Sequence, residues 1–448
     1  MAEKKFNLFL NSRIANFNKT IEVDSDKSLS IRSFLIGSIA QNISFTKNIL
    51  ESEDVKNTIS VCRKLGVKII KLKSKTYKIY GNGLGSLFAK KKTTLNFGNS
   101  GTLARLLIGI LTTTPNINFK ITGDHSLNKR NMKKLINLMT KFGASFLPKN
   151  KFTFPLNIIS SSMPVGIKYK AGVSAQLKSA VILAALNSYG TTTVEETIIS
   201  RDHTENILKK NKKAIKVIKK KNKIIKVFGK NEIKPINIKI SGDPSSAAFF
   251  TTLTLLNLKS SIKIKNVGLN PTRIGFYRIL KKHNANIKFK NLKKQNGEIS
   301  GDIIVKSSKL KPLKTPSEFY PSTTDEYLLL FLIASFQKGT STFKGISDLA
   351  NKESSRAFEM KKILKQVGIR CILKKDEMKI FGKGKIDTKK KNIYVENLGD
   401  HRIAMCAFIL AILTNTKTLI KNFETVFTSS PSFLKIMKTL GANFEIKR

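Results

Sequence analysis

The apolar positions of this chain fall into helix-length runs, and a short polar cluster precedes each run. The clusters are built from Ser, Thr, Asp, Asn and Gly. Counted from one position in each (26, 99, 174, 243, 325 and 400), they are 73, 75, 69, 82 and 75 residues apart. Six units of similar length predict a repeat architecture.

Each unit also carries shorter β-branched or alternating stretches bounded by Gly or Pro, which predict strands. They lie at 68–78, 118–122, 191–195, 262–267 and 340–344. Further helices are expected at 132–142, 204–212, 273–283, 355–367 and 432–440. The pattern predicts an α/β protein with two lobes of three repeats, and a crossover between the lobes near residues 241–242.

The polar clusters have a direct physical interpretation. Ser, Thr, Asp and Asn are preferred helix N-caps, and the free N–H groups and dipole at a helix N-terminus favour anions. Six such ends directed at one cleft would bind anionic ligands. The alternative is that the clusters are ordinary caps of buried helices.

The charge of the chain is strongly positive. It has 82 Lys and Arg and a formal net charge of +53, and 12 of the 82 are arginines. The lysines are spread along the chain together with many Asn and Ile, as an AT-rich coding sequence would produce. The densest run, 209–223, is expected to be a solvated helix end and turn before a strand. A basic nucleic-acid-binding protein remains an alternative, but we expect no specific nucleic-acid partner.

The arginines are more informative than the lysines, because a guanidinium binds carboxylate or phosphate through two parallel hydrogen bonds. Seven lie in or beside small polar clusters: Arg32, Arg105, Arg130, Arg201, Arg273, Arg356 and Arg402. They predict a binding site for a small, doubly anionic ligand, assembled from distant parts of the chain.

Cysteine and histidine give no sign of a metal site. Cys62, Cys371 and Cys406 are scattered, and the four histidines lie far apart. We therefore expect no metal, no disulfide framework and a reducing cytoplasm. The longest apolar runs, 327–334 and 404–413, are shorter than the ~18–20 residues of a membrane span, so neither a membrane segment nor a secretory leader is expected.

The clusters, taken in order, resemble motifs of the enolpyruvyl transferase family, in particular the branch that acts on shikimate 3-phosphate. The matching segments are DKSLSIR (26–32), FGNSGTLAR (97–105), TGDHSLNKR (122–130), SAQLKSA (174–180), SRDHTEN (200–206), SGDPSSAAFF (241–250), NPTR (270–273), TDEY (324–327), KESSR (352–356) and GDHRIAM (399–405). This resemblance implies a two-lobed inside-out α/β barrel in which each lobe has three βαβαββ repeats. The first lobe would be residues 23–241, and the second 1–22 plus 242–448.

The resemblance also implies an activity. The enolpyruvyl group of phosphoenolpyruvate would move to the 5-hydroxyl of shikimate 3-phosphate and phosphate would leave, a step toward chorismate and the aromatic amino acids. No cofactor is implied, and we expect a cytoplasmic monomer. Because Gly101 is glycine, glyphosate is expected to compete with phosphoenolpyruvate.

Residue roles follow from the matched motifs. Shikimate 3-phosphate would be bound by Lys27, Ser28, Arg32, Ser174, Ala175, Gln176, Ser200, Arg201, Asp325 and Lys352. Phosphoenolpyruvate would be bound by Lys27, Gly101, Arg130, Gln176, Arg356 and Arg402. Asp325 would be the base at the hydroxyl, and Glu353 and Lys27 are the candidate acids at the methylene. Arg105 and Arg273 are interpreted as structural.

Some positions depart from the family motifs. Ser355 stands where Asp is common, and Ala350-Asn351 stand where Arg-Val is common. A second alternative is the sister enzyme that transfers enolpyruvate to UDP-N-acetylglucosamine. That family often uses a loop cysteine as an acid, and here no cysteine lies between Cys62 and Cys371.

Overall fold

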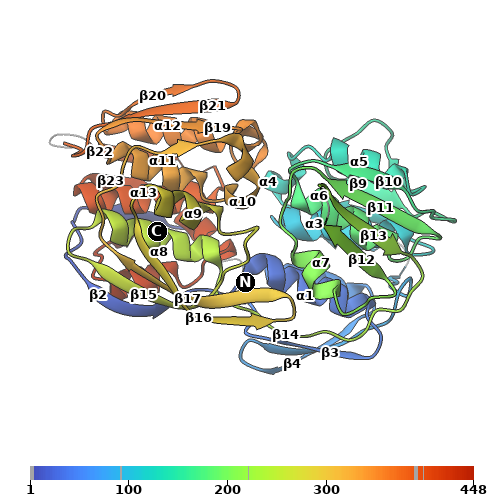
Figure 1. Cartoon of the computed structure of the whole chain (residues 1–448). Coiled ribbons are helices and arrows are strands. Elements are labelled where there is room, and N and C mark those ends of the chain that lie inside the picture. Colours follow the sequence, from blue (N-terminus) through green and yellow to red (C-terminus); the bar gives the residue numbers. More distant parts are fainter. Residues whose placement is uncertain (1–4, 91–92, 220, 388–391, 397, 448) are drawn as a thin grey trace. The chain divides into compact units, whose positions relative to one another are not determined.

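The fold was analysed in a computed structural model, which describes residues 5–90, 93–219, 221–387, 392–396 and 398–447. The chain divides into two compact units (Figure 1). The N-terminal unit comprises Ser25–Ser241 and Lys294–Glu298. The C-terminal unit comprises Met1–Asp24, Gly242–Lys293 and Ile299–Arg448. Each unit has its own hydrophobic core.

The N-terminal unit contains three four-stranded sheets, ordered β14-β3-β5-β4, β6-β7-β9-β8 and β10-β11-β13-β12. In each, the first pair is parallel and the other pairs are antiparallel. The strands are β3 Ile43–Lys47, β4 Lys68–Lys73, β5 Thr76–Tyr80, β6 Thr94–Asn96, β7 Asn118–Thr122, β8 Ser145–Leu147, β9 Leu156–Ile159, β10 Lys168–Ala171, β11 Thr191–Glu196, β12 Ile215–Lys219, β13 Lys223–Phe228 and β14 Asn237–Lys239.

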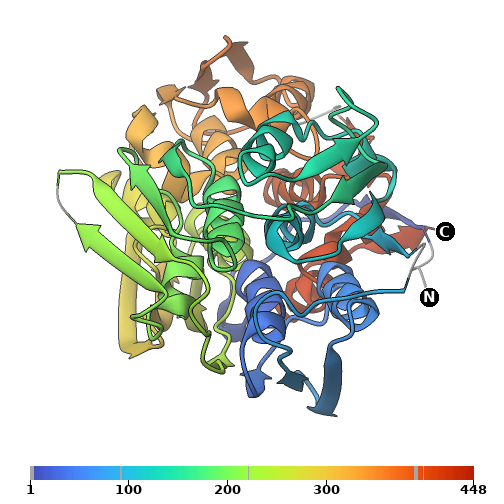
Figure 2. The same ribbon diagram turned by 90° about the vertical axis from the view of Figure 1, so that its right-hand side faces the viewer.

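Three nearly fully buried helices form the interior of this unit, and the sheets lie around them (Figure 2). They are α1 Lys27–Ile39, α3 Gly101–Thr113 and α6 Ala175–Ala185. Because α1 and α6 are buried on most sides, their apolar residues do not follow a single helix face. The remaining helices are α2 Glu53–Lys64, α4 His125–Asn128, α5 Lys133–Thr140 and α7 His203–Leu208.

The C-terminal unit has sheets ordered β16-β17-β15-β2, β18-β19-β21-β20 and β22-β23-β1-β24. Its strands are β1 Asn7–Leu10, β2 Asn18–Glu22, β15 Ser261–Gly268, β16 Asn286–Gln295, β17 Glu298–Lys306, β18 Lys314–Thr315, β19 Gly339–Lys344, β20 Arg370–Leu373, β21 Glu377–Gly382, β22 Asn392–Val395, β23 Lys417–Ile420 and β24 Glu445–Lys447.

Buried helices again form the interior of this unit: α8 Pro244–Leu256, α11 Tyr327–Ser335 and α13 His401–Thr414. The others are α9 Gly275–Lys282, α10 Tyr320–Thr323, α12 Arg356–Gln366, α14 Phe433–Thr439, and the 3-10 turns η1 Ser317–Phe319, η2 Ser347–Asn351 and η3 Phe423–Thr428.

The repeat is a βαβαββ unit, seen without interruption in β10-α6-β11-α7-β12-β13. Where the chain crosses between units, the sheet of a repeat includes one strand that is distant in sequence. The strand β14 pairs with β3, and β1 pairs with both β23 and β24. The predicted α/β fold is confirmed, with helices inside and sheets outside in each unit.

Two local predictions need correction, and one helix was not predicted. Residues 68–78 form the hairpin β4–β5 rather than one strand, because Lys75 takes a positive φ of 55° at the turn. The lysine-rich run 209–223 includes the edge strand β12, so only its first part is a helix end and turn. The helix α2 has no counterpart among the predicted elements.

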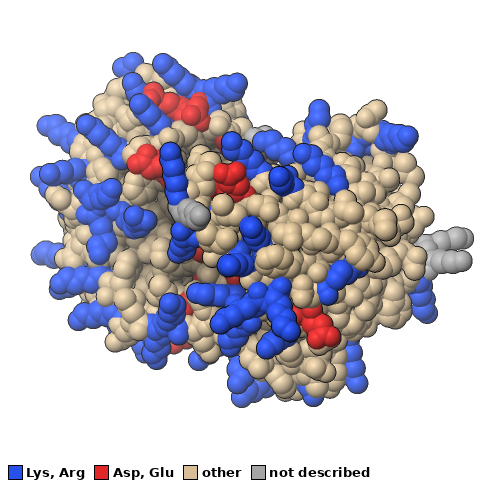
Figure 3. Space-filling model, turned by 45° about the vertical axis from the view of Figure 1, so that its right-hand side comes forward, with Lys and Arg blue, Asp and Glu red and all other residues tan. Residues whose placement is uncertain are grey.

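Lysine and arginine side chains are spread over the face shown in Figure 3, with few acidic groups between them. This distribution agrees with a compositional bias rather than one binding arm. No helix within the described residues is long and apolar enough to cross a membrane.

Candidate functional site

Three polar clusters of the N-terminal unit are helix N-caps. Asp26 caps α1 by accepting the Leu29 N–H at 2.8 Å, and Ser100 and Ser174 cap α3 and α6 in the same way. The first helical turns carry Lys27, Ser28, Gly101, Ala175 and Gln176. Their N–H groups lie at the positive ends of the helix dipoles, where an anion is stabilised.

Arg32 is buried, and the helices around it hold its guanidinium. Its Nε donates to Thr204 Oγ1 at 2.9 Å and its Nη2 to Ser179 Oγ at 3.1 Å. Its Nη1 donates to the Ser28 hydroxyl. Burial lowers the pKa of Arg32 to about 10, and the charge of Arg201 acts in the same direction. The carboxylates of Asp26 and Glu205 act in the opposite direction and partly offset these two effects.

Gln176 is fixed between two helix N-termini. Arg105 Nη1 donates to Gln176 Oε1 at 2.9 Å and to the Gly101 carbonyl at 3.2 Å, and Gln176 Nε2 donates to Thr102 Oγ1 at 3.0 Å. Arg105 therefore holds the side chain of Gln176, which is a predicted substrate-binding residue, in addition to contacting its own helix.

Arg130 also approaches Gly101. A Cβ added at Gly101 would lie 2.8 Å from both Arg105 Nη1 and Arg130 Nη1. Arg130 Nη2 donates to Asn99 Oδ1. The absence of a side chain at Gly101 thus leaves room for two guanidinium groups.

Lys27, a candidate acid, forms an ion pair that the sequence did not reveal. Its Nζ lies 3.0 Å from Asp54 Oδ2, in the first turn of α2. Asp54 is buried, so the pair fixes the ammonium group near the N-terminus of α1. Because α2 was not predicted, no sequence signal identified this partner.

Asp325 of the C-terminal unit has three arginines around its carboxylate. Arg356 Nη1 lies 3.4 Å from Oδ1, Arg273 Nη1 lies 3.7 Å from Oδ2, and Arg402 Nε lies 3.8 Å from Oδ1. Arg402 Nη1 also donates to the Asp325 carbonyl at 3.2 Å. The structure therefore brings together three predicted residues from distant motifs, together with Arg273.

Arg356 is the centre of this cluster. Its Nε donates to Asp400 Oδ2 at 2.8 Å and its Nη2 to Glu353 Oε2 at 2.6 Å. Burial alone would lower the pKa of Arg356, but the carboxylates of Asp400, Glu353 and Asp325 raise it above its ordinary value. Glu353, a candidate acid, is therefore an ion-pair partner of Arg356.

The remaining predicted groups have separate partners. Lys352 Nζ pairs with Asp348 at 2.6 Å, a residue that the motif analysis did not select. Arg273 pairs with Asp243, the N-cap of α8, at 3.2 Å and with Glu326 at 3.3 Å, which agrees with a structural role. Ser355 is the N-cap residue of α12 but makes no side-chain cap bond.

The arrangement of helices inside sheets is that of the enolpyruvyl transferases. The solved enolpyruvyl transferase NikO from Streptomyces tendae superposes with a TM-score of 0.76 over 99% of this chain and 98% of its own, and at 12% identity this likeness concerns the fold alone. The sequence profile of EPSP synthase (3-phosphoshikimate 1-carboxyvinyltransferase) matches residues 12–437. The chain belongs to this family.

Individual relatives agree with the family assignment. A 3-phosphoshikimate 1-carboxyvinyltransferase from Paramagnetospirillum magneticum is 35% identical over 433 residues, 96% of each chain. One from Petrotoga mobilis is 37% identical over 427 residues, 95% of this chain and 97% of its own. The EPSP synthase structure from Acinetobacter baumannii is 33% identical, with a TM-score of 0.84 over 99% of this chain and 100% of that one. The predicted family is confirmed, and the match favours the shikimate 3-phosphate branch over both alternatives.

Proposed function

We propose that this chain transfers the carboxyvinyl group of phosphoenolpyruvate to the 5-hydroxyl of shikimate 3-phosphate and releases phosphate. The reaction would serve the shikimate pathway, which leads to chorismate and the aromatic amino acids. The family match across residues 12–437 is the observation that carries this proposal. The two arginine-rich groups described above support it, because both substrates are anionic.

The chemistry proceeds by addition and then elimination. The hydroxyl oxygen bonds to C2 of phosphoenolpyruvate and loses its proton, while the methylene carbon gains one and becomes a methyl group. The methyl group then returns a proton as phosphate leaves C2, which restores the double bond. The chain must therefore supply a base, an acid and cations that hold the phosphate.

Residues of the N-terminal unit are proposed for the phosphate and ring of shikimate 3-phosphate. They are Lys27, Ser28, Arg32, Ser174, Ala175, Gln176 and Arg201. The guanidinium groups of Arg32 and Arg201 support this assignment, because a guanidinium binds phosphate through paired hydrogen bonds. Ser200 stands apart, since its hydroxyl already donates to Glu196.

The same proposal assigns phosphoenolpyruvate to Lys27, Gly101, Arg130 and Gln176 together with Arg356 and Arg402. Asp325 is the proposed base at the hydroxyl, and Lys352 a proposed contact of shikimate 3-phosphate. Of the two proposed acids, Lys27 is held by its ion pair with Asp54 at 3.0 Å. The other, Glu353, lies 2.6 Å from Arg356.

Coupled release of phosphate tests the function. The purified chain is mixed with phosphoenolpyruvate and shikimate 3-phosphate, and phosphate is measured continuously. We expect turnover with this pair and none when UDP-N-acetylglucosamine replaces the shikimate compound. Absence of turnover at saturating shikimate 3-phosphate would refute the proposal.

Cellular location, oligomeric state and glyphosate binding belong to the same proposal. Cys62, Cys371 and Cys406 are free thiols, which suits the cytoplasm. A monomer is proposed, and sedimentation of the purified chain tests it. Competition by glyphosate is proposed because Gly101 has no side chain between the helix N-terminus and the ligand.

A further inference from the structure

Ser200 directs both of its polar hydrogens at one carboxylate oxygen. Its N–H lies 3.0 Å and its Oγ 2.7 Å from Glu196 Oε1, and the residue is 1% exposed. A serine hydroxyl has one proton to donate, and a phosphate dianion offers only acceptors. The hydroxyl therefore cannot donate to Glu196 and to a substrate phosphate at the same time.

Two buried lysines hold Glu196 in place. Lys178 Nζ lies 2.9 Å from Oε1, and Lys223 Nζ lies 3.1 Å from Oε2. Both lysines also pair with Glu205, at 2.8 and 3.0 Å. Two ammonium groups and two carboxylates make the cluster electrically neutral, and every charge is paired, which is the condition for burying charge.

The cluster also holds the backbone of the loop between β11 and α7. Lys178 Nζ donates to the Ser200 carbonyl at 3.4 Å, so the N–H, C=O and O–H of Ser200 are all bonded to this one charged cluster. Thr204, at the start of α7, links the loop to Arg32 through its hydroxyl at 2.9 Å. The residue that follows Ser200 is Arg201, whose charge acts on Arg32.

We propose that Glu196 is a positioning residue that acts through Ser200. It fixes the loop so that Arg201, and not the Ser200 hydroxyl, donates to the phosphate of shikimate 3-phosphate. This inference rests on the proposed function. It changes the role of Ser200 from a substrate-binding residue to a residue that fixes the loop.

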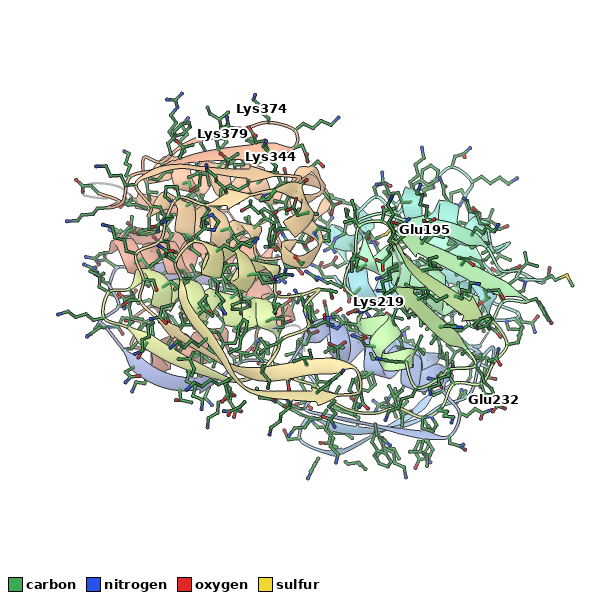
Figure 4. All side chains as sticks on the ribbon, viewed as in Figure 1. Glu195, Lys219, Glu232, Lys344, Lys374 and Lys379 are labelled. Carbon is green, nitrogen blue, oxygen red and sulfur yellow. The ribbon has the colours of Figure 1, made fainter. Side chains whose placement is uncertain are left out.

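A neighbouring residue supplies the matched control. Glu195, labelled in Figure 4, precedes Glu196 on β11. Successive side chains of a strand point to opposite faces, and Glu195 is half-buried and accepts from Asn222 at 2.6 Å. Glu195→Gln makes the same chemical change as Glu196→Gln without touching Ser200.

A double-mutant cycle tests the inference, with KM for shikimate 3-phosphate as the readout. We expect Glu196→Gln to raise this KM roughly tenfold and Ser200→Ala to raise it by less. The double variant should have the same KM as Glu196→Gln alone, because the effects of two coupled residues do not add. KM for phosphoenolpyruvate should change by less than about twofold, because none of the residues proposed to bind it belongs to this loop. Glu195→Gln should behave as the unmodified chain. Multiplicative effects of the two single changes would overturn the inference, because Ser200 would then act independently of Glu196.

Arg201→Ala provides a test that does not depend on Glu196→Gln being folded. It should raise KM for shikimate 3-phosphate more than Ser200→Ala does; the reverse order would overturn the inference. Failure of the proposed function is distinguishable, since the unmodified chain would then show no turnover at all.

Discussion

Arg356 Nε lies 2.8 Å from Asp400 Oδ2, and both side chains are buried. The other oxygen of Asp400 accepts the N–H of Arg402 at 3.0 Å and caps α13. The Asp400 carboxylate therefore holds the side chain of Arg356 and the backbone of Arg402, which are both proposed to bind phosphoenolpyruvate. This link joins motifs that are more than forty residues apart in sequence.

Asp400→Asn should weaken both the fold and the handling of phosphoenolpyruvate. Asparagine keeps an oxygen for the helix cap but loses the charge beside Arg356, so we expect a loss of about 1–3 kcal/mol in the free energy of unfolding. KM for phosphoenolpyruvate should rise roughly tenfold, because a misplaced binding group is costly. Denaturant unfolding and steady-state kinetics measure the two effects. Asp302→Asn removes a carboxylate of the same unit that pairs with Lys263, and should change stability only. An unchanged KM in Asp400→Asn would contradict the role given to this link.

Ser355→Asp restores the residue common in the family, and the structure predicts a gain in stability with little effect on kinetics. Ser355 makes no cap bond, whereas Asp at this position would cap α12 and oppose its dipole. The melting temperature should rise by about 1–3 °C. Arg356 already pairs with three carboxylates, so KM for phosphoenolpyruvate should stay within about twofold. Ser355→Ala is the control and should change neither quantity. A large gain in turnover with Asp would show that Arg356 is poorly oriented in the natural chain.

Gly101→Ala should impair phosphoenolpyruvate binding without disrupting α3. The new Cβ would lie 2.8 Å from the guanidinium ends of Arg105 and Arg130, which must move. We expect KM for phosphoenolpyruvate to rise roughly tenfold, and glyphosate to inhibit less strongly because it is proposed to use the same groups. Gly172→Ala is the matched control, since its Cβ meets nothing within 4 Å. Equal inhibition by glyphosate in the variant and the unmodified chain would argue against the proposed glyphosate site.

Arg130→Lys should affect phosphoenolpyruvate far more than shikimate 3-phosphate. Lysine keeps the charge but loses the planar fork that binds a carboxylate or phosphate with two bonds. An increase in KM for phosphoenolpyruvate of roughly tenfold or more is expected, with KM for shikimate 3-phosphate nearly unchanged. Initial rates with each substrate varied in turn measure both constants. Equal losses would reject the assignment of Arg130.

The cysteines should be unreactive at neutral pH. Burial raises the pKa of Cys62 and of Cys371 to about 11, and raises that of Cys406 further. Because the thiolate is the reactive form, only about one thiol in a thousand is reactive at pH 8, and the fraction grows as the pH rises toward 11. Iodoacetamide at pH 8 should leave turnover intact, while the unfolded chain takes up label at all three cysteines. Rapid labelling with loss of activity would indicate a catalytic thiol, as in the sister enzyme.

The sequence by itself determined the family, the fold class and the starts of the buried helices that follow the polar clusters. These features depend on local patterns: an N-cap such as Asp26 or Ser174 bonds only three residues ahead, and an apolar run needs no distant partner to be recognised. The motif arginines were also visible, because so few of the 82 cations are arginine.

Only the tertiary structure decided which side chains form hydrogen bonds and ion pairs with the motif residues. The partner of Lys27 is Asp54, on an unpredicted helix, and Arg105 turned out to hold Gln176 across 71 residues of sequence. The strands β1 and β14 join sheets whose other members lie far along the chain. A hydrogen bond or ion pair depends on distances of a few ångströms in space. Local sequence patterns carry no such distances, so these pairings became visible only once the chain was folded.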